Sequence, residues 1–166
     1  DATGLVTTDD YDHRSDYFDF EIHNISPFGS SVYVVIPLND GIPEYSLYRK
    51  FSADNGWQNF VENSNNSLAS SEADNDVCPA PQSELYQAGL TKGHQCVRLF
   101  IEDGGANDAD GLVNGIIDDP GGIALVPNSE VAKETDPEQS SSGSMYWLLL
   151  LVLASLRFKH YRQGRL

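Results

Sequence analysis

Residues 17–38 read YFDFEIHNISPFGSSVYVVIPL, and this stretch decides the fold class. The aromatic and aliphatic residues of 18–22 alternate with acidic ones, which is typical of a strand with one buried face. The run at 31–38 is apolar on both faces, which favours an inner strand that ends at a proline. Because a proline and a glycine at 27–29 supply a turn between the two strands, we expect a hairpin.

Strand signals continue along the chain. A strand is expected at 45–51, another begins at 57–60 after a glycine turn, and the alternating CVRLFIED at 96–103 predicts one more. The polar, aperiodic NSNNSLASSEADND at 63–76 indicates a loop. No stretch before the C-terminal apolar run sustains helical periodicity over three turns. We therefore predict an all-β domain at 17–127, a small antiparallel β-sandwich of the Ig-like type.

The charge of the chain is divided between two regions. All 25 acidic residues but only six of the ten Lys and Arg residues precede Met145, so residues 1–144 carry a net charge of −19. The last 22 residues carry +4. We expect the acidic region to repel nucleic acid and to attract cations, so no nucleic-acid partner is predicted.

The C-terminal run MYWLLLLVLASL, residues 145–156, is followed by a basic segment at 157–166 that includes Arg157, Lys159 and Arg162. Basic residues after an apolar run stay on the cytoplasmic side, so we expect the membrane to be contacted through 145–156 as a short transmembrane helix. Twelve residues of helix span about 18 Å, less than the roughly 30 Å of a bilayer core. The length therefore favours a sorting signal over a permanent anchor.

Two polar segments flank the expected domain. Residues 1–16 are interpreted as a linker from a missing N-terminal region, and 128–144 as a flexible spacer without aromatic residues. Gly143 and Ser144, the apolar run and the basic end together resemble the GlyGly-CTERM sorting signals of Gram-negative bacteria. That resemblance implies cleavage by an intramembrane sorting protease, although Ser144 stands where the second glycine is expected.

Two cysteines, Cys78 and Cys96, are expected to form a disulfide. The acidic composition and the C-terminal tail favour an oxidising compartment, while the alternative is a pair of buried free thiols. Cys96 falls on the same side of its strand as Arg98. A bridge to Cys78 is therefore expected to pin the preceding loop across the outer face or at the strand entrance.

The segment EDGGANDADGLVNGIIDDPGG at 102–122 is the densest candidate site. Closely spaced Asp and Asn side chains with glycines between them supply the oxygen ligands that calcium requires. The alternative is an acidic turn whose side chains bond to their own backbone. The candidate calcium ligands are Asp103, Asn107, Asp108, Asp110, Asn114 and Asp118.

No nucleophile elbow, zinc-protease motif or phosphate-binding loop occurs in the sequence, so we expect no enzyme. A carboxylate-based hydrolase would require two acids that converge in a cleft. Aromatic residues at 45–60 are either core or a sugar-binding platform. Exposure of Trp57 would favour a calcium-dependent adhesive or glycan-binding module, and its burial would favour a non-catalytic, membrane-proximal module that displays an N-terminal region. The four residues concerned are Tyr45, Tyr48, Trp57 and Phe60.

Separated motifs within residues 17–125 resemble the choice-of-anchor U domain of bacterial surface proteins. This resemblance implies a non-catalytic domain that lies next to the interchangeable anchor of a larger exported protein. We therefore expect a membrane-proximal module at the cell surface of a Gram-negative bacterium, with residues 1–144 outside the cytoplasm. The motifs are YRKF at 48–51, GWQNF at 56–60, CPAP at 78–81, YQAGLTKGHQCVRLFIEDGGANDADG at 86–111 and NGIIDDPGG at 114–122.

Overall fold

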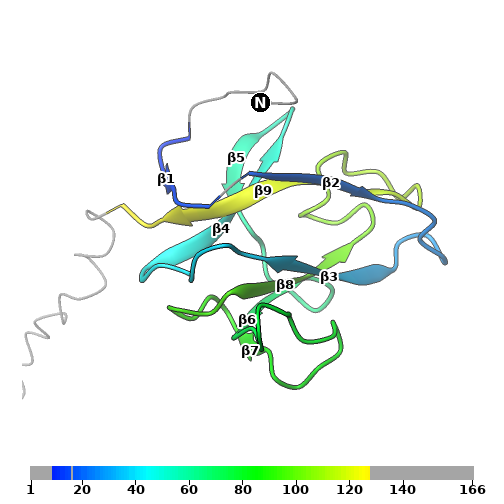
Figure 1. The fold of residues 1–166 in the computed structure, drawn as a ribbon. Coiled ribbons are helices and arrows are strands. Elements are labelled where there is room, and N and C mark those ends of the chain that lie inside the picture. The colour runs from blue at the N-terminus through cyan, green and yellow to red at the C-terminus, as the bar shows by residue number, and fades with distance from the viewer. Residues whose placement is uncertain (1–8, 16, 128–166) are drawn as a thin grey trace, which may run out of the picture. The chain divides into compact units, whose positions relative to one another are not determined.

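Nine strands in two antiparallel sheets form the described part of the chain, residues 9–15 and 17–127 (Figure 1). This computed structural model contains no helix within those residues. The predicted all-β class is therefore confirmed. The spacer expected at 128–144, the apolar helix expected at 145–156 and the basic end at 157–166 lie outside the described residues.

The first sheet is organised around β9 (Ile117–Leu125), the longest of the described strands. Along one side β9 pairs with β4 (Ser46–Ser52), and β5 (Gly56–Asn59) continues the sheet beyond β4. Along its other side β9 pairs with β2 (Phe18–Ile22) and β1 (Asp12–His13). Segments from the beginning, middle and end of the domain therefore meet on one central strand.

The second sheet is centred on β8 (Cys96–Glu102), which lies between β3 (Ser31–Pro37) and β6 (Ser67–Ser71). The two-residue β7 (Gln87–Ala88) pairs with the outer side of β6. The three inward-facing aliphatic side chains of β8 are completely buried. The period-two pattern that predicted this strand thus reflects one face packed on the core.

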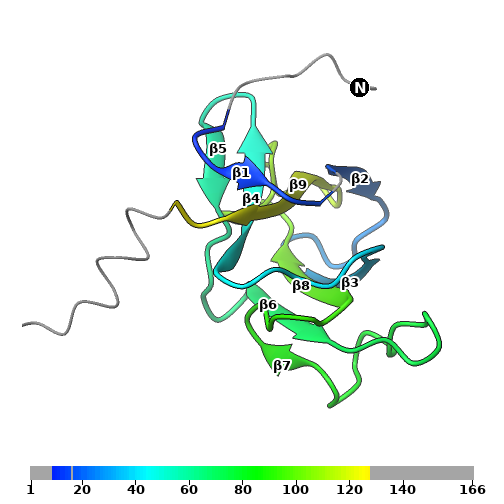
Figure 2. The same cartoon turned by 60° about the vertical axis from the view of Figure 1, so that its left-hand side comes forward.

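The core lies between the two sheets, which occupy separate layers in both views (Figure 2). Aliphatic side chains of β8 meet those of β9 and the ring of Tyr48 from β4. Ile25 and Ile42 close the core from connecting segments. This arrangement is sandwich-like, as expected, and it places the β8–β9 connection at an end of the domain where both sheets contribute.

The predicted hairpin at 17–38 is wrong. Both of its strands are present, but β2 pairs with β9 in the first sheet whereas β3 pairs with β8 in the second. The chain therefore crosses between sheets after Ile22. The strand at 31–37 is also an edge strand and not an inner one, since β8 is its one paired neighbour among the described strands. On its outward face the exposed ring of Tyr33 stacks on that of Phe100, with 4.4 Å between the ring centroids.

The polar stretch at 63–76, expected to be a loop, contains the buried strand β6. Its alternation is hidden because serines occupy buried positions, and Ser70 is fully buried. The Ser70 hydroxyl accepts the backbone N–H of Thr91 at 2.9 Å and lies 3.0 Å from Nδ1 of His94. Buried hydroxyls that have such partners are compatible with a central strand.

Residues 9–15, expected to belong to a linker, join the first sheet through β1, and the side chains of Asp9 and His13 make further contacts there. The Asp9 carboxylate accepts hydrogen bonds from Nε and Nη2 of Arg49 at 2.9 and 2.7 Å. Nε2 of His13 lies 2.7 Å from the same carboxylate. The β-domain therefore includes residues from Asp9 onward, and these contacts define an N-terminal strap, residues 9–15.

Candidate functional site

Asp103 is the centre of the acidic loop that joins β8 to β9. Its side chain is almost completely buried, and its carboxylate oxygens accept backbone N–H bonds from Gly29 at 2.7 Å, Asn114 at 3.1 Å and Gly115 at 3.0 and 3.1 Å. These hydrogen bonds, first the one from Gly29, hold the pKa of Asp103 below its ordinary value of 3.8. Asp103 thereby ties the acidic loop to the β2–β3 connection.

Asp108 closes the loop onto the start of β9. Its Oδ2 accepts the Gly104 N–H at 2.8 Å, and its Oδ1 accepts the Asp118 N–H at 3.0 Å. Burial raises the pKa of Asp108 even though these two hydrogen bonds oppose the shift. The carboxylate therefore replaces backbone pairing at the point where the loop re-enters the sheet.

Asn107 connects the loop to the segment between β5 and β6. Its amide oxygen accepts the Val61 N–H at 2.8 Å, and its Nδ2 donates to the Val61 carbonyl at 2.8 Å and to Oδ1 of Asn66 at 2.9 Å. The same Asn66 oxygen accepts the Glu102 N–H at 3.2 Å. Asn66 is fully buried. It was missed from the sequence because it lies in the polar stretch that resembles a loop.

Asp110 and Asn114 form the exposed tip of the loop. Asp110 accepts the Leu112 N–H at 2.8 Å and Nδ2 of Asn114 at 2.9 Å. Asn114 in turn accepts the Ile116 N–H at 2.8 Å. Both side chains therefore stabilise local turns by bonding to the backbone two residues further on.

Asp118, the last predicted ligand, lies in β9 directly opposite Glu21 of β2. Burial, followed by the negative charges of Asp19 and Glu21, raises the pKa of the Asp118 carboxyl. Like charges at cross-strand positions are destabilising. Asp118 therefore belongs to an acidic outer face of the first sheet as much as to the loop.

These contacts match the alternative interpretation, an acidic turn whose Asp and Asn side chains bond to the backbone. Asp103, Asn107 and Asp108 already direct oxygens at N–H donors. Across the described residues, no group of three or more His, Cys, Asp or Glu side chains is arranged to hold a metal ion. Calcium binding by the loop stays a prediction.

The disulfide between Cys78 and Cys96 is present, as predicted. It attaches the loop before β7 to the outer face of the second sheet, on the side of Arg98. Nη1 of Arg98 donates to the carbonyls of Pro81 at 3.1 Å and Ser83 at 3.3 Å. The disulfide and the Arg98 guanidinium therefore both hold the loop that contains Cys78, Pro81 and Ser83 against β8.

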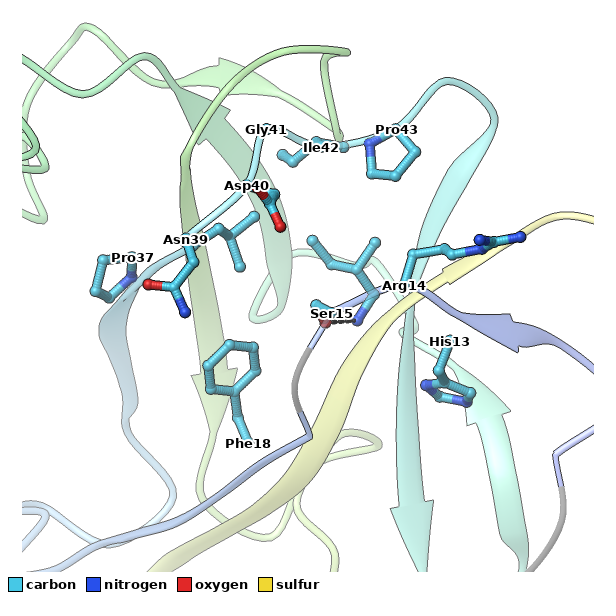
Figure 3. A pocket seen from close by; sticks show the side chains of 12 residues that line it. His13, Arg14, Ser15, Phe18, Pro37, Asn39, Asp40, Gly41, Ile42 and Pro43 are labelled. Atoms are coloured by element: carbon cyan, nitrogen blue, oxygen red, sulfur yellow. Dashed lines mark hydrogen bonds between the residues drawn. The ribbon is translucent and has the colours of Figure 1, made fainter.

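A cleft of about 480 Å³ opens between the start of β2 and the segment that follows β3 (Figure 3). Phe18 lies on one side and Asn39 and Asp40 on the other. Asp40 is the single carboxylate among the described residues that line it. A carboxylate-based hydrolase would need a second acid here, and this lining does not supply one.

The aromatic residues considered as a platform occupy different environments. Tyr48 is 1% exposed in the core, where Phe60 packs edge-on at 6.2 Å. Tyr45 is exposed. Trp57 is half-buried on the outer face of the first sheet and packs against Tyr17 at 5.5 Å. Trp57 therefore satisfies neither the exposed nor the buried expectation.

A buried ion pair, Lys50 with Asp119, was missed from the sequence. Nζ of Lys50 contacts Oδ1 of Asp119, and the two side chains are 7% and 0% exposed. Burial lowers the pKa of Lys50 and raises that of Asp119, while each partner's charge opposes the other's shift. Tyr48 lies in the same interior, where burial and then the charge of Asp119 raise its hydroxyl pKa well above the ordinary value. One sequence signal was available: residues two apart in a strand share a face, so a lysine two residues after the core residue Tyr48 should also point into the core.

Comparison of the chain with protein-family models, with curated proteins and with solved structures finds no match. The predicted sorting residues Gly143, Ser144, Arg157, Lys159 and Arg162 lie outside the described residues. Within the described residues, no helix is long and apolar enough to cross a membrane.

Proposed function

We propose that this chain is a non-catalytic, membrane-proximal module of an exported surface protein of a Gram-negative bacterium. In this proposal an Ig-like β-sandwich displays an N-terminal region outside the cytoplasm. The apolar run at 145–156 then acts as a sorting or anchoring signal, and the basic end at 157–166 stays in the cytoplasm.

The observation that carries the proposal is the Cys78–Cys96 disulfide. Disulfides persist in oxidising compartments and are rare in the cytosol. Cys96 is completely buried in a cluster with Ala69 and Tyr86, and Cys78 packs against that cluster. A structural bridge of this kind supports export of the domain.

The composition of the tail supports membrane sorting. A net charge of −19 precedes an uncharged run of twelve residues, and +4 follows it. This order matches the positive-inside arrangement. The resemblance to the choice-of-anchor U domain and to GlyGly-CTERM signals adds the expectation of an intramembrane sorting protease, which would act near Gly143 and Ser144.

Fractionation of Gram-negative cells tests the proposal when they export the full chain behind a cleavable signal peptide. We expect the protein in the membrane fraction, with the disulfide formed and with residues 17–127 accessible to protease added outside the inner membrane. Mass spectrometry of its C-terminus then distinguishes a cleaved tail from an intact one that ends at Leu166. A reduced protein in the cytosol would contradict the proposal.

A charge-reversed tail is the matched control. Replacing Arg157, Lys159 and Arg162 by Glu keeps the apolar run and its length but removes the basic end. We expect this variant to lose its membrane orientation while the domain still forms its disulfide. An unchanged orientation would show that the basic end does not direct sorting.

The exposed ring of Tyr17 favours a second candidate, a calcium-dependent adhesive or glycan-binding module. Tyr17 is 63% exposed beside the half-buried Trp57, and together they present an aromatic surface on the first sheet. Titration with chitohexaose or cellohexaose, followed by tryptophan fluorescence in wild type and in Trp57→Phe, which keeps Trp147, tests this candidate. An unchanged spectrum with both sugars would contradict this candidate, and the aromatic surface would then serve only to pack against the N-terminal strap.

A further inference from the structure

The proposed function assigns no role to the buried ion pair between Lys50 and Asp119. Lys50 projects from β4 and Asp119 from β9 into the space between the sheets. In the register Lys50 lies opposite Gly121, so Asp119 is the diagonal neighbour on the same face. A lysine side chain is long enough to reach across such a diagonal. The two side chains therefore meet inside the sandwich across adjacent paired strands.

The local packing favours this meeting. A Cβ atom at Gly121 would lie 2.7 Å from Cε1 of Tyr48 and 3.0 Å from its hydroxyl oxygen. A glycine here thus leaves room for the Tyr48 ring over β9. The Tyr48 ring is 1% exposed, and the side chains of Lys50 and Asp119 are 7% and 0% exposed, so little water reaches the charged groups.

The two groups have almost no polar partners. Among the described residues, Nζ of Lys50 and both carboxylate oxygens of Asp119 make no hydrogen bond apart from their mutual contact, and the Tyr48 hydroxyl has no partner either. An ammonium group carries several N–H donors, and a carboxylate offers several acceptor sites. A buried ion pair that leaves most of these sites unused is an unfavourable arrangement.

We propose that Lys50 and Asp119 condense into an intramolecular amide that joins β4 to β9 covalently. The ammonium first passes one proton to the carboxylate, which gives an amine and a carboxylic acid. Nζ then attacks Cγ of Asp119, the bond between Cγ and the hydroxyl oxygen breaks, and that hydroxyl leaves with an amine proton as water. One N–C bond forms and one C–O bond breaks, and no oxidant or cofactor is consumed.

The interior favours the product because the reaction removes two buried charges and leaves one amide N–H and one carbonyl. The Tyr48 hydroxyl, which is buried beside the pair, can then donate to that carbonyl. Lys50 also lines a second, smaller cleft of about 210 Å³ next to the acidic loop, which gives the released water a route outward.

Peptide mapping of the purified full chain tests the proposal. After reduction and alkylation, trypsin cuts after Arg49 and Arg98 but not after an acylated Lys50. Linked protein therefore yields one branched peptide, lighter than its two separate parts by one water molecule. We expect this peptide, with fragment ions that place the link at Lys50 and Asp119. Recovery of cleavage after Lys50, together with an unlinked Asp119 peptide, would overturn the proposal.

The conservative variant Lys50→Arg is the matched control, since its guanidinium keeps the charge but does not form this amide. We expect no branched peptide from Lys50→Arg or from Asp119→Ala. A branched peptide of the same composition in either variant would place the link elsewhere and would also overturn the proposal. Because the wild-type map decides the question by itself, a variant that fails to fold does not weaken the test.

Discussion

At the scale of single residues, the buried carboxylates of this domain fall into two kinds. Asp103 is surrounded by backbone N–H donors from two loops, so its charge is stabilised by hydrogen bonds. Asp119 instead faces a lysine and has no N–H donor from the backbone among the described residues. Substitution of the first kind should weaken the loop, whereas substitution of the second should disturb the contact between β4 and β9.

Asp103→Asn should lower the melting temperature at neutral pH, because an amide cannot accept all the N–H bonds that the carboxylate accepts. The folded pKa of Asp103 is depressed, so its stabilising contribution is present above its ordinary value of 3.8 and is lost as pH falls through the folded value. Thermal unfolding from neutral pH down to about pH 2 should therefore show a gap between wild type and variant that closes on acidification. Asp110→Asn, in the exposed tip of the same loop, is the control. A gap that persists at the acid end would contradict the assignment.

Asp118→Asn should raise the melting temperature at neutral pH, since Asp118 lies opposite Glu21 and its pKa is raised by burial and by neighbouring acids. A raised carboxyl pKa means that stability is lost as pH rises through the folded value, and the loss is absent below the ordinary value of 3.8. The variant should thus exceed wild type at neutral pH and equal it in acid. Asp54→Asn, an exposed acid in the β4–β5 turn, should change neither value. A lower melting temperature for Asp118→Asn would show that its charge supports the fold.

At the scale of elements, the Cys78–Cys96 disulfide fixes the loop before β7 to the outer face of the second sheet. Cys78 and Cys96 close a loop with a sequence separation of 18, and a bridge of that length contributes about 3 kcal/mol by restricting the unfolded chain. We expect the double variant Cys78→Ala/Cys96→Ala to lose about this much unfolding free energy in urea. Wild type in reductant should behave similarly, while the double variant should not respond to reductant. Equal stability of all samples would show that the Arg98 contacts alone hold the loop.

Element type was predictable from sequence wherever apolar residues alternate along one strand. The strands at 18–22 and 96–102 carry this signal, the strand at 31–37 was predicted from an apolar run, and those at 46–52 and 56–59 were predicted on either side of a glycine turn. The structure contains all five. Pairing was not predictable, because successive strands with a good turn between them went to different sheets. Local sequence does not encode which sheet a strand joins.

Four of the nine described strands were not predicted, namely the two-residue β1 and β7 and the longer β6 and β9. β6 buries serines that have hydrogen-bond partners, and β9 contains, directly after Ile117, the Asp-Asp-Pro-Gly-Gly run that is typical of turns. The same limit applies to the candidate site. The acidic loop was found from its composition, but the partners of Asp103 and the meeting of Lys50 with Asp119 depend on contacts between distant strands.

At the scale of the whole molecule, the excess of acidic residues raises the question of cations. Because Asp103, Asn107 and Asp108 are engaged by N–H donors, the acidic-turn interpretation predicts the same melting temperature in chelator and in millimolar calcium. A ligand that binds only the folded state must stabilise it in proportion to the logarithm of its concentration. A rise that saturates with calcium but not with magnesium, and that Asp110→Asn reduces, would support the predicted calcium site instead.

The chain enters and leaves the first sheet at the same end, where Asp12 of β1 pairs with Leu125 of β9. Tension applied between these two points acts on one residue pair at a time, so β1 unzips from β9 without shearing the sheet. His13, whose ring lies 4.6 Å from that of Trp57, would be pulled away early. The second sheet and its disulfide lie outside this load path. Single-molecule pulling should therefore record a weak first step that exposes the indole before the core yields, and a single high-force event would contradict this order.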